Sequence, residues 1–315
     1  MTMTKRLYTF ILAHYEQFRY IFTAIDSILD QDYPAIEIIV IDDGSTDFDK
    51  EKALDYIDKN KRENIKSVQV LVNDENIGTV RSLNRALKAA QGEYIQIFAA
   101  DDRLRAGDIA SGFVTEFERL GDEAEIISAQ AMYMDEEMNP TGSFFCDLQL
   151  HEKFNDMDAG EQFEKVSVKC RWAMGAICAR TELYKRIGYF SENCKYVEDW
   201  PFFLRATRSG VKVHTIGLTA LEHRAGGIST TVLDPGAPLA IECMTDVLNA
   251  LETEVIPYMS AFPVRHQNEV YEKYYREYAV LTQIGGQRKK LRWSDFCKYS
   301  KKIVLWRILT GRWRK

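Results

Sequence analysis

Three pairs of adjacent acidic residues are the positions at which this chain of 315 residues could do chemistry. They are Asp42-Asp43, Asp101-Asp102 and Glu198-Asp199. Carboxylate oxygens bind hard divalent cations, accept hydrogen bonds from hydroxyl and N–H groups, and take up protons as general bases. The same residues are common in helix caps and solvated turns, so each pair also has a structural interpretation.

The pair Asp101-Asp102 follows a predicted strand and opens a loop. A cation that is held mainly by the phosphate groups of a substrate needs only one or two protein carboxylates. We therefore expect Asp101 and Asp102 to bind Mn²⁺ or Mg²⁺, with a helix cap or solvated turn as the alternative.

The pair Asp42-Asp43 comes directly after a β-branched run at 36–41. At the end of a buried strand, its carboxylates could accept hydrogen bonds from a nucleobase or from ribose hydroxyls. Tyr15, at the end of an earlier strand, could stack on the base. Turn formation is the alternative, since Gly44 and Ser45 follow.

The pair Glu198-Asp199 immediately precedes an apolar, aromatic helix that begins at Trp200. Burial against such a helix raises the pKa of a carboxyl group toward the range of a general base. Acidic pairs also cap helices, and the local sequence favours neither interpretation.

The elements that position these pairs alternate between strand and helix in the first half of the chain. Strands are predicted at 7–12, 36–41, 68–72 and 94–98, and helices at 20–29, 47–60 and 78–91. This alternation predicts an α/β fold with a mostly parallel sheet flanked by helices. Ligand sites in such sheets lie beyond the carboxyl ends of the strands, where residues 13–15, 42–43 and 101–102 would meet.

The second half is less regular. Strands are predicted at 125–134, 176–179 and 211–216, a turn at 139–142, helices from 181 and at 200–208, and an irregular polar stretch at 143–170. Beyond about residue 237 the apolar spacing is helical.

A series of short motifs runs through about residues 7–230. Its members are residues 10–16, 27–31, 37–47, 76–78, 92–95 and 188–190, followed by Glu198, Asp199 and Arg205. In order and spacing they resemble the inverting glycosyltransferases of family 2, which have the Rossmann-like GT-A fold. Residues 37–47 match the family pattern almost letter for letter.

The resemblance implies a single inverting displacement that moves a sugar from a nucleotide-diphosphate sugar, expected to be a UDP-sugar. The acceptor would be a hydroxyl of a glycan or lipid-linked molecule in bacterial polysaccharide biosynthesis. The implied nucleotide-binding residues are Ala13, His14, Tyr15, Glu16, Asp42, Asp43, Asn76 and Asp101. Asp101 and Asp102 would bind the metal, and Asp199 would be the catalytic base with Glu198 supporting it.

The resemblance also implies a division of the chain. A catalytic GT-A domain would occupy 1–232, with a nucleotide-binding half at 1–105 and an acceptor half at 106–232. A helical C-terminal extension would follow at 233–315. We expect residues 143–172 and the helices after residue 237 to shape the choice of acceptor.

The sequence departs from the family pattern in three places. Ala13 and Glu16 replace the usual Pro and Asn of the first loop, so this loop could present the nucleotide differently. Ala99 stands where many relatives have Asp, which implies modest metal affinity. His223 and Arg224 lie slightly off the register of a family histidine, and either could reach the diphosphate.

Residues 288–315 form a basic tail with eleven Lys or Arg and one Asp, although the whole chain has a formal net charge of −6. Aromatic and apolar residues recur in this tail at spacings of three and four. It could therefore contact an anionic membrane surface or pack on the acidic body of the protein. Nucleic acid is not an expected partner, since that body repels phosphates.

The chain contains no apolar stretch that approaches the roughly 18 residues needed to span a bilayer. We expect a cytoplasmic protein, peripheral at the inner face of the membrane if the basic tail binds lipid. The six cysteines lack the spacing of a zinc site and predict reduced thiols.

Two other functions fit part of the sequence. A degenerate domain of the same fold could bind a nucleotide without catalysis, although Asp102 and Asp199 are both retained. A nucleotidyltransferase would need a Gly-rich, basic phosphate loop near the first strand, which residues 13–17 do not provide. A P-loop enzyme is excluded by the absence of its motif.

Overall fold

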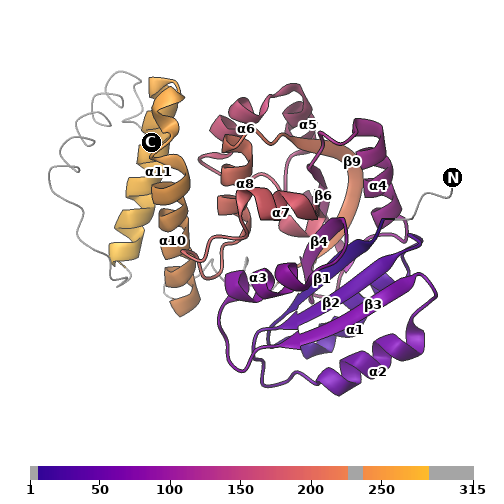
Figure 1. The fold of residues 1–315 in the computed structure, drawn as a ribbon. Helices are drawn as coiled ribbons and strands as arrows, with labels where there is room; N and C mark the ends of the chain where they lie inside the picture. The colour runs from indigo at the N-terminus through magenta and orange to yellow at the C-terminus, as the bar shows by residue number, and fades with distance from the viewer. Residues whose placement is uncertain (1–5, 226–236, 284–315) are drawn as a thin grey trace.

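The computed structural model describes residues 6–225 and 237–283. These residues form an α/β protein around a nine-stranded sheet, which confirms the predicted fold class (Figure 1). The basic tail lies outside the described residues, so the expectation of membrane contact through 288–315 stays a prediction.

The first half supplies a block of parallel strands. Its elements are β1 (Tyr8–His14), α1 (Phe18–Leu29), β2 (Ile36–Asp42), α2 (Lys50–Asn60), β3 (Ile65–Val72), α3 (Thr79–Ala89) and β4 (Tyr94–Ala99). The strands pair in the order β3-β2-β1-β4, all in parallel. Strand β2 is buried along its whole length, as its β-branched sequence predicts. The carboxyl ends of β1, β2 and β4 therefore share one edge of the sheet.

The second half extends this sheet with mixed pairing. Its elements are β5 (Arg103–Leu104), α4 (Ile109–Leu120), β6 (Ile126–Met134), β7 (Pro140–Phe144), α5 (Leu148–Lys153), η1 (Phe154–Asp156), α6 (Ala159–Val166), η2 (Met174–Ala176), β8 (Ile177–Arg180), α7 (Thr181–Ile187), α8 (Asp199–Arg208) and β9 (Val213–Arg224). The order continues as β4-β8-β6-β9-β5. Strand β8 is antiparallel to both β4 and β6, whereas β6 and β9 run parallel.

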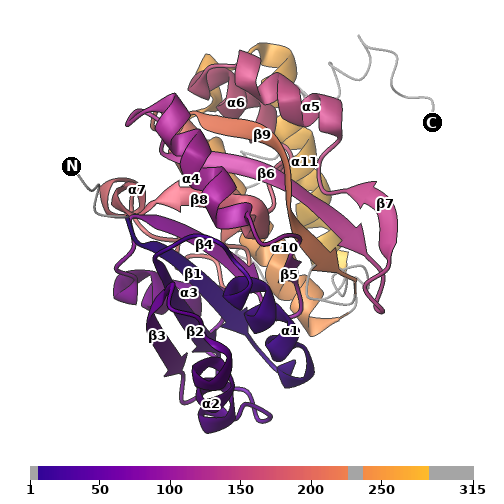
Figure 2. The ribbon, with the colours of Figure 1, turned by 90° about the vertical axis from the view of Figure 1, so that its right-hand side faces the viewer.

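The sheet separates two apolar cores because alternate side chains point to opposite faces. Phe10, Leu12 and Ile38 pack with α1, α2 and α4 on one face. Ile11 and Ile39 face the other side, where α3 and α8 cover them. Figure 2 shows α4 lying over β6 and β9.

Four local predictions were wrong. The stretch at 143–170 contains α5 and α6, and α6 begins with a capping box between Asp158 and Glu161. The turn expected at 139–142 runs into β7, and the strand expected to end at residue 216 continues to Arg224. Helix α2 is capped by Asp49, not by Asp47, whose carboxylate accepts from the N–H of Phe18 at 3.0 Å.

The C-terminal extension is helical where it is described, as predicted. It contains α10 (Pro238–Ala250), the π-helix η3 (Leu251–Val255), η4 (Met259–Ala261) and α11 (Val264–Gln283). Helices α10 and α11 lie side by side (Figure 1). Leu248, Leu251 and Val270 join the same apolar core as α3 and α8, so the extension packs directly on the α/β body. Within the described ranges, no helix has the length and hydropathy needed to cross a bilayer.

Candidate active site

The side chain of Asp42 connects, through hydrogen bonds, the end of β1 to the loop that follows β2. Its Oδ1 lies 2.7 Å from Nδ1 of His14 and accepts from the hydroxyl of Ser45 at 2.5 Å. Its Oδ2 accepts from the backbone N–H groups of Gly44 and Ser45 at 3.1 and 3.0 Å. Burial raises the pKa of Asp42, but the hydrogen bonds from His14 and Ser45 outweigh it and lower the pKa overall. Asp42 therefore builds the turn, and a nucleotide contact of this residue stays a prediction.

Asp43 holds the next loop in the same way. Its carboxylate accepts hydrogen bonds of 2.7–2.9 Å from Nδ2 of Asn73, the hydroxyl of Ser82 and the backbone N–H groups of Ile77 and Gly78. These contacts fix residues 73–78, and with them Asn76, at the N-terminus of α3. Asp43 is 5% exposed, and all of these contacts are within the protein, so Asp43 also stabilises a loop.

Tyr15 and Glu16 form the rim of this edge, directly after the buried His14. Glu16 adopts a left-handed backbone conformation with φ 51°, and its carboxylate accepts from the N–H of Thr46 at 2.9 Å. The side chain of Tyr15 stays open to solvent, with 43% of the residue exposed. An exposed ring next to three anchored loops is suitably placed for stacking on a flat ligand.

The pair Asp101-Asp102 lies after β4 and against the end of β9. Oδ2 of Asp102 is 2.9 Å from Nδ1 of His223, and Oδ1 accepts from the N–H of Arg224 at 2.9 Å. The guanidinium Nε of Arg224 donates to the backbone oxygen of Asp101 at 3.0 Å. Both basic residues therefore contact the acidic pair.

Two groups of this cluster, Asp101 and His223, have raised pKa values. Burial, followed by the charge of Asp102, raises the pKa of Asp101 to about 6. Burial acts to lower the pKa of His223, but its hydrogen bond to Asp102 and the nearby carboxylate charges raise it overall. A bound cation would offset the electrostatic repulsion between these two buried carboxyl groups.

The donor set fits a particular kind of metal site. Among residues 6–225 and 237–283, no three His, Cys, Asp or Glu side chains form a ready cage for a metal ion. Mg²⁺ at phosphate sites is commonly held by one or two carboxylates, with the substrate's phosphate oxygens and water completing the shell. Asp101 and Asp102 fit that arrangement, in which much of the coordination comes from the substrate.

The pair Glu198-Asp199 lies at the N-terminus of α8 (Asp199–Arg208). Glu198 is the N-cap residue, yet its side chain makes no capping hydrogen bond. Oδ1 of Asp199 accepts from the N–H of Trp200 at 2.6 Å, and Oδ2 accepts from the thiol of Cys170 at 3.6 Å. A simple capping role therefore does not explain Glu198.

Burial shifts the pKa values of both carboxyl groups of this pair, and the charge of Asp199 adds to the shift of Glu198. Burial, followed by the charge of Asp199, raises the pKa of Glu198 to about 8. Burial also raises the pKa of Asp199, whereas the hydrogen bonds from Trp200 and Cys170 act to lower it. With a pKa of about 8, Glu198 keeps its proton at neutral pH, and the pKa of Asp199 is also raised overall although these hydrogen bonds oppose the rise.

The predicted site residues thus form two clusters. One gathers at the ends of β1, β2 and β4, and the other begins α8. Asp102 and Asp199 share no hydrogen-bonding partner within the described residues. Sequence reasoning missed Cys170, because a single cysteine in a stretch expected to be irregular gives no signal of a contact 29 residues away.

The parallel strands and the acidic edge of the sheet are those of the GT-A fold. Residues 9–177, more than half of the chain, match the model of glycosyl transferase family 2. The chain therefore belongs to this family.

Several bacterial glycosyltransferases are similar to this chain. It is 26% identical over 227 residues to the Escherichia coli UDP-Glc:α-D-GlcNAc-diphosphoundecaprenol β-1,3-glucosyltransferase WfaP, a match that covers 71% of this chain and 80% of that protein. Three other bacterial glycosyltransferases are matched over 61%, 39% and 58% of their own lengths. The chain thus spans only part of these three relatives.

Two solved structures share the fold. Residues 1–349 of TarS from S. aureus, in complex with UDP, align with a TM-score of 0.58 at 17% identity, covering 86% of this chain and 72% of that one. The mannosyltransferase PcManGT from Pyrobaculum calidifontis, in complex with GDP-Man and Mn²⁺, aligns with a TM-score of 0.54 at 16% identity, covering 96% and 81%. At these identities the likeness shows the fold alone.

Proposed function

We propose that this chain is an inverting, metal-dependent glycosyltransferase that moves a sugar from a nucleotide-diphosphate sugar to a hydroxyl group. A UDP-sugar is the expected donor, and a glycan or lipid-linked saccharide of bacterial polysaccharide biosynthesis is the expected acceptor. The observation that carries the proposal is the Glu198–Asp199 pair at the start of α8, where burial raises the pKa of both carboxyl groups toward the range of a general base. Family membership and the likeness to WfaP support the donor and acceptor classes.

On the donor side, the ring of Tyr15 would stack on the nucleobase. Asn76 would line the nucleotide from the loop before α3. Asp42 and Asp43 are buried and engaged, so we infer that they act mainly by holding the loops that surround the nucleotide. His14 and Glu16 also make hydrogen bonds that connect these loops.

At the diphosphate, Asp101 and Asp102 would hold Mn²⁺ or Mg²⁺, which would neutralise the charge that develops on the leaving group. His223 keeps Asp102 in place through the 2.9 Å hydrogen bond from its Nδ1 atom. Such partners of metal ligands fix the orientation of the ligand and its basicity.

On the acceptor side, Asp199 would take the proton from the attacking hydroxyl group. The hydroxyl oxygen forms a bond to the anomeric carbon while the bond between that carbon and the diphosphate oxygen breaks. The electron pair of the broken bond leaves with the nucleoside diphosphate, and attack from the opposite face inverts the anomeric configuration. Glu198, which stays protonated, avoids a second negative charge beside the base.

A thermal-shift panel of UDP-, GDP- and CMP-sugars with and without Mn²⁺ tests the proposal. A ligand that binds only the folded state raises the unfolding midpoint by mass action. We expect a sugar nucleotide to raise the midpoint in the presence of Mn²⁺, and the shift to be lost in Asp102→Asn. The absence of a metal-dependent shift from every nucleotide would contradict the proposal. A shift without any turnover would instead support the degenerate nucleotide-binding domain.

A further inference from the structure

The segment that leads into the Glu198–Asp199 pair is held from two sides. On the side of α3, the amide of Asn84 makes two hydrogen bonds with the backbone of Phe190, at 3.0 and 2.9 Å. The N–H of Val80 donates to the carbonyl oxygen of Lys195 at 3.1 Å. These contacts connect the segment to the helix whose N-terminus Asp43 organises.

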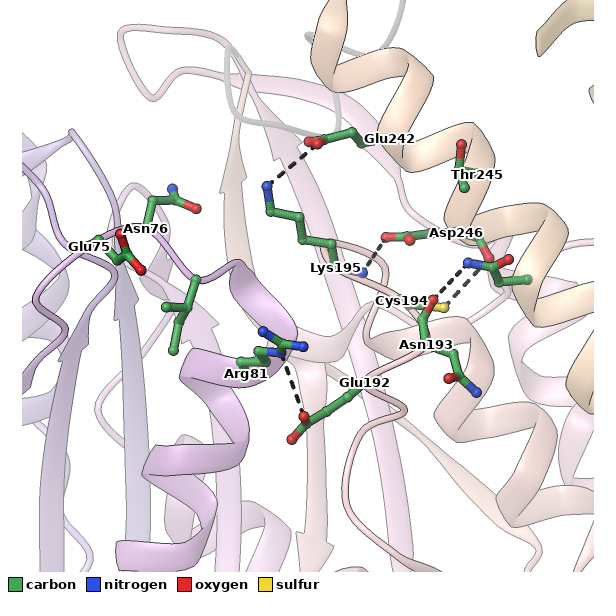
Figure 3. A pocket seen from close by; sticks show the side chains of 12 residues that line it. Glu75, Asn76, Arg81, Glu192, Asn193, Cys194, Lys195, Glu242, Thr245 and Asp246 are labelled. Atoms are coloured by element: carbon green, nitrogen blue, oxygen red, sulfur yellow. Dashed lines mark hydrogen bonds and ion pairs between the residues drawn. The ribbon is translucent and has the colours of Figure 1, made fainter. Parts of the chain in front are cut away.

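On the opposite side, the segment is held by α10 of the C-terminal extension. One oxygen of Asp246, Oδ2, accepts hydrogen bonds from three successive backbone N–H groups. Figure 3 shows the first of them, from Lys195. The donors are Lys195 at 2.9 Å, Tyr196 at 2.7 Å and Val197 at 3.1 Å. Asn249, one turn further along α10, donates to the carbonyl oxygen of Asn193 at 2.7 Å.

Successive N–H groups that converge on one point form an anion-binding nest, and here the anion is a side chain of the protein itself. Asp246 is 4% exposed, so these hydrogen bonds are shielded from water and are of the strong, charge-assisted kind. The last donor, Val197, is the residue directly before Glu198. A displacement of the Asp246 carboxylate would therefore displace the backbone directly before the acidic pair.

Asp246 also acts on the pair through its charge. The charges of Asp199 and Asp246 both add to the effect of burial on the pKa of Glu198. Loss of the Asp246 charge would therefore make ionisation of the pair easier, in addition to loosening its backbone.

We propose that Asp246 is a positioning residue for the transfer reaction, so that α10 of the C-terminal extension completes the active site by fixing the segment that carries the base. The inference rests on the proposed function, since it assumes that Asp199 removes the acceptor's proton. It gives the extension a role in the reaction itself, in addition to its packing on the α/β body.

Glu242 provides a matched control on the same helix. Its Oε1 lies 3.5 Å from Nζ of Lys195, and the two side chains are 45% and 44% exposed (Figure 3). It thus contacts the side chain of a residue whose backbone Asp246 holds. Exposed ion pairs of this kind contribute little, so Glu242→Gln should leave the position of the segment unchanged.

The test compares Asp246→Ala, Asp246→Asn and Glu242→Gln in the full chain, with the rate of donor turnover measured against pH. Displacement of a catalytic group by about 1 Å can lower the rate about 100-fold. We expect Asp246→Ala to lower kcat about 10- to 100-fold with little change in the KM of the donor. The Asn variant keeps an acceptor oxygen without the charge, so it should recover much of kcat while the acidic limb of its pH profile moves to lower pH.

Hydrogen exchange at the amides of residues 195–197, faster in both Asp246 variants than in Glu242→Gln, should accompany these changes. Wild-type kcat and an unmoved pH profile in both Asp246 variants would overturn the inference. So would equal effects in the Glu242 variant. Should Asp246→Ala fail to fold, the Asn variant decides through its pH profile. A wild-type chain without turnover would instead refute the proposed function, and this inference with it.

Discussion

Nδ1 of His223 lies 2.9 Å from Oδ2 of Asp102, although 121 residues separate the two in the chain. The contact exists because β9 runs for twelve residues and ends beside the loop that follows β4. It joins the last strand of the sheet to the proposed metal site and gives the acidic pair an imidazole partner.

His223→Ala should weaken metal-dependent donor binding. Loss of a residue that orients a metal ligand typically costs about 10- to 100-fold in affinity. We expect the Mn²⁺-dependent affinity for the donor, measured by calorimetry, to fall within that range. His214→Ala is the matched control, since this half-buried histidine lies on the same strand near Glu116 and Arg119. Equal losses in the two variants would show that the effect comes from damage to β9.

The titration of Glu198 predicts how stability depends on pH. Its pKa of about 8 in the folded state lies above the ordinary value of 4.5, so between these values the folded protein holds a proton that the unfolded chain has released. Stability conferred by this group is therefore present at low pH and is lost as the pH rises through about 8. The titratable groups that face Glu198 are Asp199, Asp246, Cys170, Cys194 and Cys243.

Glu198→Gln keeps the shape of the neutral form at every pH. Thermal melts between pH 5 and 8 should show that the free energy of unfolding of the variant rises relative to that of the wild type as the pH increases. The difference should grow by roughly 1 kcal/mol per pH unit at most. Glu192→Gln, an exposed change in the same segment, should follow the wild type. A difference between Glu198→Gln and the wild type that stays constant with pH would contradict the assigned protonation.

Tyr15 should contribute to nucleotide affinity and not to stability. Its ring is exposed, and stacking of a base on an aromatic side chain contributes about 1–3 kcal/mol. We expect Tyr15→Ala to weaken UDP binding by about 5- to 100-fold at an unchanged melting temperature, with Tyr15→Phe close to the wild type. Unaltered UDP affinity in the alanine variant would remove Tyr15 from the base site.

Gly44 should be intolerant of substitution. Its φ of 72° is strained for other residues, and a Cβ there would lie 2.7 Å from the Cα of Glu75. Gly44→Ala should therefore destabilise the fold by at least about 1 kcal/mol and displace the loop that includes Asn76. Gly142→Ala serves as the control, because it has a similar φ of 76° but nothing within 4 Å. Equal melting temperatures for the two variants would show that strain alone, without the contact to Glu75, sets the cost.

The nucleotide-binding half was predictable because its signals are local. The β-branched run at 36–41 predicts a strand buried on both faces, and β2 is such a strand. The turn after β2 followed from Gly44 and Ser45, and the structure shows Asp42 accepting from both. Short-range chemistry of this kind needs no knowledge of the rest of the chain.

Other features depend on contacts between distant segments. Helices α5 and α6 have only six and eight residues, too few for a clear apolar period, although the Asp158–Glu161 capping box was a signal in the sequence. Strand β9 was predicted too short because it pairs with β6 through register shifts. The three hydrogen bonds of Asp246 span about 50 residues and leave no pattern in the sequence.

Whether Asp199 is the base of an inverting transfer is tested most directly by ¹H NMR of the sugar released from an α-linked UDP-sugar with Mn²⁺, water taking the place of the acceptor. We predict that the wild type releases the β-anomer first. Asp199→Asn should lower the rate at least about 100-fold while metal-dependent donor binding is retained. Release of the α-anomer first, or an undiminished rate in Asp199→Asn, would contradict the assignment.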